Sequence, residues 1–222
     1  AAGASTYLFN AESSTNASIT DTVTTIENIT GSNGEDYIIG SATANTIIGG
    51  GEADVITGGT GADIFKYTAT TATALAAETG ATKGTDNDFV LGLGDKITDF
   101  VSGTDKIHID ATALTNAVGT EVDTLKTIAA AGTVANTDRF VEITTAQADG
   151  TMGVAVTLLN GLTTTAVAIA DSFIAYINDG TDGYVYMVEQ VSAANTIAAQ
   201  DVTLLGQVTG VTDIINGDLV TF

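Results

Sequence analysis

Residues 31–66 read GSNGEDYII, GSATANTII, GGGEADVIT and GGTGADIFK when they are written in blocks of nine. Each block opens with a glycine: Gly31, Gly40, Gly49 and Gly58. The sixth position holds an acid or its amide: Asp36, Asn45, Asp54 and Asp63. The eighth position holds one large apolar residue: Ile38, Ile47, Ile56 and Phe65. Self-similarity at a fixed short period predicts stacked repeats, in which each block adds one layer to a common core.

The residue types at these positions predict a parallel β-roll that binds Ca²⁺. Glycine permits the positive φ angles of tight turns, and the single apolar residue points inward from a short strand. The acid then stays in the turn beside exposed backbone carbonyls, and both are hard oxygen ligands that suit Ca²⁺. We include the turn residues Gly34 and Gly61 in the predicted ligand set. The alternative is a glycine-rich loop with scattered aspartates, against which the strict register of the blocks argues.

The four blocks resemble the nonapeptide repeats of the RTX (repeats-in-toxin) family. In that family successive turns lie on alternate edges of the roll, and a calcium ion sits between turns two blocks apart. The resemblance implies one site at Asp36 and Asp54 and a second at Asn45 and Asp63. Because the first pair supplies two formal negative charges and the second only one, we expect the first site to be tighter.

The repeat pattern resumes at residues 91–97, LGLGDKI, where Asp95 and Ile97 are two positions apart. Residues 97–110, ITDFVSGTDKIHID, follow directly. They resemble the segment that follows the roll in RTX proteins, including the C-terminal halves of serralysin-type secreted proteases. The resemblance implies that Asp99 turns inward to the last calcium-bearing turn and that Asp105 lies in the turn before the next strand. Asp95, Asp99 and Asp105 therefore join the predicted metal ligands, with a solvent-facing Asp-rich hairpin as the alternative for the last two.

The expected fold is all-β with minor helix: a parallel β-roll of nonapeptide calcium repeats joined to an antiparallel β-sandwich-like C-terminal module. We expect residues 1–110 to form the roll, capped by Ile19–Thr30, with its return segment. Residues 111–222 then form the β-rich module, whose tail resembles the type I secretion signal of RTX proteins.

Three local elements are predicted outside the repeats. A short helix is expected within Ala69–Glu78. The three- and four-residue spacing of Val118, Val122, Leu125 and Ile128 predicts a second helix over Ala113–Gly132. Two β-rich runs, 172–177 and 184–188, flank an Asn/Asp/Gly loop and predict a hairpin.

Composition excludes several classes of function. The 222 residues include 27 acidic and 6 basic ones, for a formal charge of −21, so nucleic acid and anionic membranes are poor partners. The sequence contains no run of 18 or more apolar residues, so it does not predict a membrane-spanning helix. Cysteine is absent, so disulfides are excluded. Yet 44% of the residues are hydrophobic, which is enough to build a core.

Enzymatic chemistry is not expected. The one histidine, His108, cannot supply the His-Glu-x-x-His zinc helix of a serralysin protease, and we expect it to be a strand residue. The sequence also has no cysteine nucleophile, no Gly-x-Ser-x-Gly elbow and no phosphate-binding Gly-rich loop.

The Thr/Ala/Gly/Asp-rich, cysteine-free composition resembles that of RTX-type bacterial surface-layer (S-layer) proteins. That resemblance implies a Ca²⁺-dependent structural protein secreted by a type I system to the surface of a Gram-negative cell. Its expected partner is itself, in a calcium-bridged lattice, with a cell-surface polysaccharide as a further candidate through a region upstream of Ala1. The alternative is the C-terminal calcium-binding secretion module of an RTX adhesin or exoenzyme. A sugar-binding module is a third interpretation, but no glycan site can be located for it.

Overall fold

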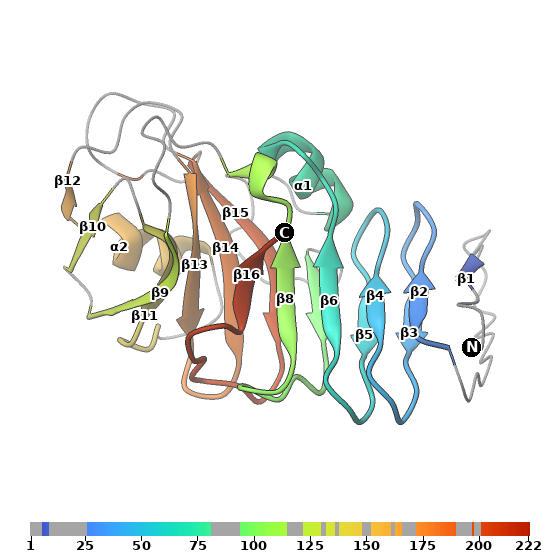
Figure 1. Ribbon diagram of the computed structural model, residues 1–222. Coiled ribbons are helices and arrows are strands. Elements are labelled where there is room, and N and C mark those ends of the chain that lie inside the picture. Colours follow the sequence, from blue (N-terminus) through green and yellow to red (C-terminus); the bar gives the residue numbers. More distant parts are fainter. Residues whose placement is uncertain are drawn as a thin grey trace.

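The computed structural model describes residues 6–8, 26–80, 94–114, 122–129, 132–135, 138–147, 152–160, 163–165, 172–189, 197 and 201–222. Within these residues the protein is built mainly of β-strands, with two short helices, α1 (Ala72–Glu78) and α2 (Met152–Asn160) (Figure 1). The predicted all-β class is thus confirmed. Neither helix is long and apolar enough to cross a membrane.

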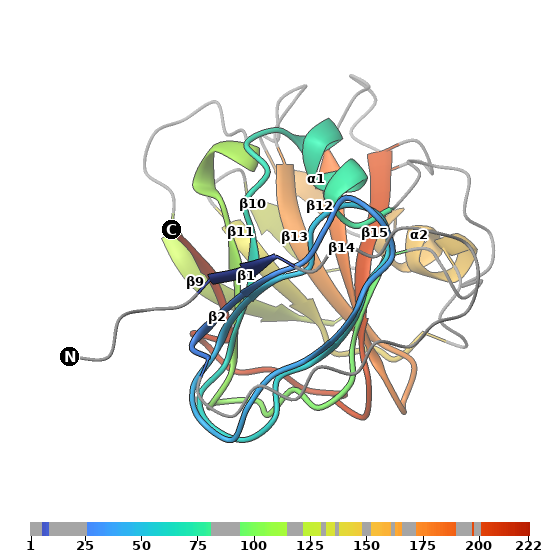
Figure 2. The same cartoon turned by 90° about the vertical axis from the view of Figure 1, so that its right-hand side faces the viewer.

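The nonapeptide blocks form a parallel roll whose strands alternate between two sheets. One sheet receives β2 (Asn28–Thr30), β4 (Thr46–Ile48), β6 (Ile64–Tyr67) and β8 (Lys106–Ile109). The other receives β3 (Tyr37–Ile39), β5 (Val55–Thr57) and β7 (Asp95–Ile97). Viewed along the roll, the coils superimpose (Figure 2).

The sequence period explains this geometry. In each three-residue strand of the repeats only the middle residue is buried, because successive side chains point to opposite faces of a sheet. The eighth-position residues therefore meet between the two sheets as one apolar column: Ile38, Ile47, Ile56 and Phe65.

Both sheets continue into the C-terminal half of the chain. On one side β16 (Leu219–Thr221) pairs with β8, which completes the order β1-β2-β4-β6-β8-β16 with β1 at Thr6–Leu8. On the other side β15 (Val202–Val208) pairs with β7. The sheet then continues through β14 (Gly183–Glu189), β13 (Ser172–Asn178), β11 (Asp138–Ile143) and β9 (Val122–Ile128). Both sheets therefore cross the boundary near residue 110, and one core cluster contains Ile56, Tyr176 and Leu219.

The C-terminal module has strands of mixed direction. The predicted hairpin is confirmed as β13 (Ser172–Asn178) and β14 (Gly183–Glu189), which are antiparallel, as are β14 and β15. In contrast, β11 (Asp138–Ile143) runs parallel to both of its neighbours, β9 (Val122–Ile128) and β13. A second core forms between this sheet and α2, and a separate parallel pair consists of β10 (Thr133–Ala135) and β12 (Thr163–Thr165).

The predicted helix over Ala113–Gly132 is wrong. A 3₁₀ turn (Ala111–Ala113) ends at the first residue of that range, and strand β9 lies further along it. Residues 115–121 lie outside the described residues. Leu125 and Ile128 pair with Phe140 and Ile143 of β11, so a distant strand supplies hydrogen bonds that outweigh a weak local helical period.

The short helix expected within Ala69–Glu78 is confirmed as α1, capped by the Thr71 side chain. Of the predicted cap Ile19–Thr30, residues 28–30 form β2, which pairs in register with β4, and residues 19–25 lie outside the described residues.

Candidate metal centre

The sixth-position residues gather along two opposite edges of the roll, as their spacing predicted. We call the edge with Asp36, Asp54 and Asp95 the Asp54 edge. Asp36 and Asp54 directly precede β3 and β5, and Asp95 is the first residue of β7. Likewise, Asn45, Asp63 and Asp105 precede β4, β6 and β8 on the Asp63 edge.

Each edge is a ladder of side-chain-to-backbone hydrogen bonds. On the Asp54 edge, Asp54 Oδ1 accepts the Asp36 N–H at 2.8 Å, and Asp95 Oδ1 accepts the Asp54 N–H at 3.0 Å. On the Asp63 edge, Asp63 Oδ1 accepts the Asn45 N–H at 2.8 Å, and Asp105 Oδ1 accepts the Asp63 N–H at 2.9 Å. Every rung joins a turn to the next turn on the same edge, so the turns are stacked in fixed register.

Two serines that sequence reasoning missed close the first turn on each edge. Asp36 Oδ2 accepts hydrogen bonds from the N–H and the hydroxyl of Ser32, at 2.6 and 2.9 Å. Asn45 Oδ1 accepts the same pair from Ser41, at 2.7 and 3.2 Å. The signal was present in the sequence, since only the first two blocks carry serine in second position, where short side chains readily bond to nearby backbone.

The second carboxylate oxygens of Asp54 and Asp63 have no hydrogen-bond partner, although each residue is only 1% exposed. Burial raises the pKa of Asp54 to about 7, with the charges of Asp36, Glu35 and Glu52 adding to the rise. Burial likewise raises the pKa of Asp63. An unpaired buried carboxylate oxygen is costly, and a cation beside it removes that cost. These two oxygens therefore fit Ca²⁺.

The glycines leave room for close approach of stacked turns. Gly50 has φ +122°, and a Cβ there would lie 1.8 Å from the Ser32 carbonyl oxygen. Gly61 has φ +128°, and its Cβ would lie 2.7 Å from the Ala44 nitrogen. Backbone thus faces backbone between the turns, which brings main-chain carbonyls close to the acids. Gly34 lies in the Asp36 turn, where its N–H donates to Ser32 Oγ at 3.2 Å.

Backbone oxygens are needed to complete any calcium site here. Across the described residues no three Asp, Glu, His or Cys side chains converge as at a preorganised metal centre. The chain would therefore hold Ca²⁺ with one or two carboxylates of each edge and with carbonyls of the stacked turns. Such all-oxygen sets suit Ca²⁺.

The three acids after the repeats extend the ladders, and their oxygens are largely engaged by the protein. Asp99 accepts the N–H groups of Gly58 and Gly59, at 2.8 and 2.7 Å. Asp105 Oδ2 accepts the Val101 N–H at 2.8 Å, in addition to its rung to Asp63. Both acids thus hold turns of the Asp63 edge in place, and their ligation of Ca²⁺ stays a prediction.

Asp95 occupies a more secluded position. It is almost fully buried, and burial, followed by the charge of Asp54, raises its pKa well above the usual range. The hydroxyl of Tyr67, a residue that sequence reasoning did not single out, hydrogen-bonds to it. Asp95 ends the Asp54 ladder, and its role as a calcium ligand also stays a prediction.

Asn45 has a structural reason to be an amide. Its Nδ2 donates to the Ile26 carbonyl, which an ionised carboxylate cannot do. Beside it the Thr46 N–H donates to the Glu27 carbonyl at 2.6 Å, and the Glu27 side chain is exposed. Asn45 therefore connects the Asp63 edge to the preceding coil by a hydrogen bond. Because it is an amide, the edge has one negative charge fewer.

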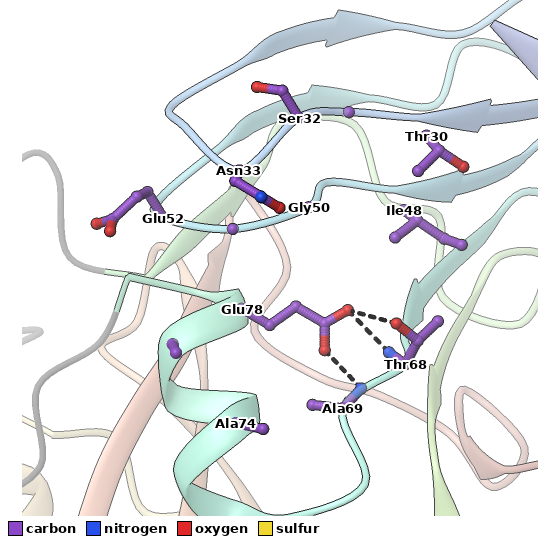
Figure 3. A pocket seen from close by; sticks show the side chains of 13 residues that line it. Thr30, Ser32, Asn33, Ile48, Gly50, Glu52, Thr68, Ala69, Ala74 and Glu78 are labelled. Atoms are coloured by element: carbon purple, nitrogen blue, oxygen red, sulfur yellow. Dashed lines mark hydrogen bonds between the residues drawn. The ribbon is translucent and has the colours of Figure 1, made fainter. Parts of the chain in front are cut away.

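Helix α1 takes the place of a further turn on the Asp54 edge. Its Ala77 carbonyl accepts the Glu52 N–H at 3.2 Å. The Glu78 carboxylate accepts the N–H groups of Thr68 and Ala69, both at 2.8 Å, and the Thr68 hydroxyl at 3.1 Å (Figure 3). An open hollow of about 510 Å³ remains between the helix and the turns that carry Ser32 and Glu52.

Glu52 is the one described non-glycine residue with positive φ, at +64°. Its position in the block is held by Gly34 and Gly61 in two of the other repeats. We expect Glu52→Gly to raise the free energy of unfolding by about 1 kcal/mol, because a left-handed conformation costs a side chain about 1–2 kcal/mol. Thermal denaturation in saturating calcium measures this, with Glu35→Gly in the same edge as the control that should not stabilise.

The repeats form a parallel β-roll, and a comparison with known families identifies their sequence pattern. Residues 30–65 match the model of the RTX calcium-binding nonapeptide repeat in four copies. No curated protein matches the chain. The match supports calcium binding by the repeats, and it covers the two stacked turns of each edge without reaching the C-terminal module.

Proposed function

We propose that this chain is part of a secreted structural protein, a component of a self-assembling bacterial surface layer whose folding is switched on by calcium. The observation that carries the proposal is the pair of orphaned, buried oxygens on Asp54 and Asp63, placed between stacked turns of calcium-binding repeats. They make the folded roll depend on a cation.

The switch follows from the charge of the chain. With a formal charge of −21, the unfolded chain repels itself in calcium-poor cytosol and stays extended for type I export. Outside a Gram-negative cell, millimolar calcium exceeds the dissociation constants of about 10⁻⁴–10⁻³ M that are typical of extracellular sites. Binding energy then becomes folding energy. The folded roll brings its acidic edges into order for contact with further copies.

We also propose that the chain has no catalytic role. His108 packs its ring against Phe222, with ring centroids 6.2 Å apart, and lies on a sheet face. The acids of the two ladders bond to backbone N–H groups, which is a structural arrangement. The partner we propose is a second copy of the chain.

The second candidate function is a calcium-binding secretion module of a larger RTX adhesin or exoenzyme. It is favoured by the confinement of the family match to residues 30–65. Any residues encoded before Ala1 would discriminate between the two. Repetitive Thr/Ala-rich β sequence supports the lattice, and a protease or lipase motif supports the exoenzyme.

A calcium titration tests the proposal. Circular dichroism should follow folding, while light scattering and electron microscopy follow assembly. We expect a soluble and partly unfolded chain in chelator, and ordered sheets or multimers in millimolar calcium. A chain that folds with calcium but stays monomeric at high concentration would refute the lattice and retain the calcium-dependent fold.

A further inference from the structure

Two of the basic residues that the structure describes, Lys66 and Lys106, lie on neighbouring strands of one sheet. Only 6 of its 222 residues are lysine or arginine, against 27 acids. Lys66 of β6 pairs in register with His108 of β8, and Lys106 begins the same strand β8. Phe222 follows β16, the next strand of this sheet. We call these four residues (Lys66, Lys106, His108 and Phe222) the cationic patch.

Contacts within the patch hold it in shape. Lys66 Nζ lies 3.8 Å from the centroid of the Phe222 ring, a cation–π contact. The His108 ring stacks on the Phe222 ring, at an interplanar angle of 23°. Lys106 is exposed, and Phe222 is 46% exposed. The patch is therefore an organised surface that a partner can reach.

The positive charges of the patch are those of Lys66 and Lys106. Burial lowers the pKa of His108, and the positive charges of Lys106 and Lys66 lower it further. Arg139 lies next to the patch, where its Nη1 donates to Thr221 Oγ1 at 3.1 Å. The half-buried Asp110, which follows β8, interacts with the charge of Lys66, and its carboxylate accepts the Thr112 N–H and hydroxyl at 2.8 and 2.6 Å.

A positive patch cannot serve as a self-complementary interface. Two copies that met patch to patch would place like charges opposite each other, which costs several kcal/mol. The partner surface must therefore be a different and acidic one. If that surface belongs to another copy of the same chain, the contact is heterologous, and such contacts propagate into open arrays unless the rotation closes a ring.

The roll provides such a surface on its Asp54 edge. Glu35 and Glu52 are both exposed there, in stacked turns, and their charges act on Asp54. Calcium bound beside Asp36 and Asp54 would offset those two buried charges and leave the glutamates as the exposed negative groups. We propose that the cationic patch of one copy docks on the Glu35/Glu52 turns of a second copy. This inference rests on the proposed function, since it names the contact through which the lattice grows.

Two lysines offer a matched pair for the test. Lys96 and Lys106 stand in the same local sequence, Asp95-Lys96-Ile97 and Asp105-Lys106-Ile107, at the start of β7 and β8 in opposite sheets. We expect Lys106→Glu in the full chain to raise the protein concentration required for assembly in calcium by at least tenfold, because it opposes like charges. Lys96→Glu changes the net charge equally and should assemble like the unaltered chain. Circular dichroism must show normal calcium-induced folding for both.

Charge reversal on the second surface makes the test sharper. The double variant Glu35→Lys/Glu52→Lys should also fail to assemble alone. Mixed in equal amounts with Lys106→Glu, it should recover assembly, since each variant then presents the charge that the other requires. A merely structural role of these residues would not produce this recovery.

The outcomes separate the two proposals. If the unaltered chain folds but never assembles in calcium, the proposed lattice function is wrong, and this contact with it. If it assembles and Lys106→Glu assembles equally well, only the contact proposed here is wrong. If both variants fail and their mixture also fails, while polygalacturonate binds the unaltered chain but not Lys106→Glu, the patch takes an anionic polysaccharide and the second-copy contact is overturned.

Discussion

Asp54→Ala should raise the calcium concentration at the midpoint of folding by about tenfold or more, and by clearly more than Asp63→Ala does. Calcium affinity depends on the number of ligand charges, and a tenfold change corresponds to about 1.4 kcal/mol. Asp54 stands beside the carboxylate of Asp36, whereas the partner of Asp63 is the neutral Asn45. Losing Asp54 therefore dismantles the site with the larger charge.

The two substitutions remove matched contacts. Each removes one ladder hydrogen bond of 2.8 Å and one orphaned buried oxygen. We therefore expect similar stabilities for the two variants in chelator and a difference only when calcium is added. Circular dichroism during a calcium titration measures both midpoints. Equal shifts would show that the charge difference between the edges does not set their affinities.

Asp218→Ala should lower the free energy of unfolding by about 3–5 kcal/mol at saturating calcium, because it breaks a buried network around a charged group. Asp218 is 2% exposed. Its Oδ1 accepts the Gly103 N–H at 2.8 Å, and its Oδ2 accepts the Ser102 hydroxyl at 2.7 Å and the Ile215 N–H at 2.9 Å. These bonds hold the residue before β16 against the turn before β8, at the end of the Asp63 edge.

Urea denaturation of the full chain measures the loss. Asp218→Asn keeps the shape and part of the acceptor capacity, so it should lie between the alanine variant and the unaltered chain. Glu27→Gln, which changes an exposed acid on the same edge, controls for net charge and should have little effect. A loss confined to low calcium concentrations would contradict the prediction, since Asp218 acts here through protein hydrogen bonds.

Much of the candidate site follows from the period of the sequence. A turn with glycine first and an acid sixth, followed by one buried residue, repeats every nine positions, so the two edges and the pairing of Asp36 with Asp54 and of Asn45 with Asp63 can be predicted. The same local logic places α1 and the hairpin of β13 and β14. These features depend on residues close in sequence or on an exact repeat, and the resemblance to RTX repeats supplied the alternation of turns between the two edges.

Other features depend on partners that no local pattern reveals. Ser102 meets Asp218 across 116 positions, and Tyr67 reaches Asp95 past an insertion in the roll. Strand β9 forms because its backbone pairs with that of β11, although the spacing of its own apolar residues favours a helix. The sequence by itself thus determined the repeating roll and its acidic edges, through backbone geometry that recurs with each block. Only the tertiary structure decided how the roll is closed and which surfaces it exposes, because those depend on long-range pairing and burial.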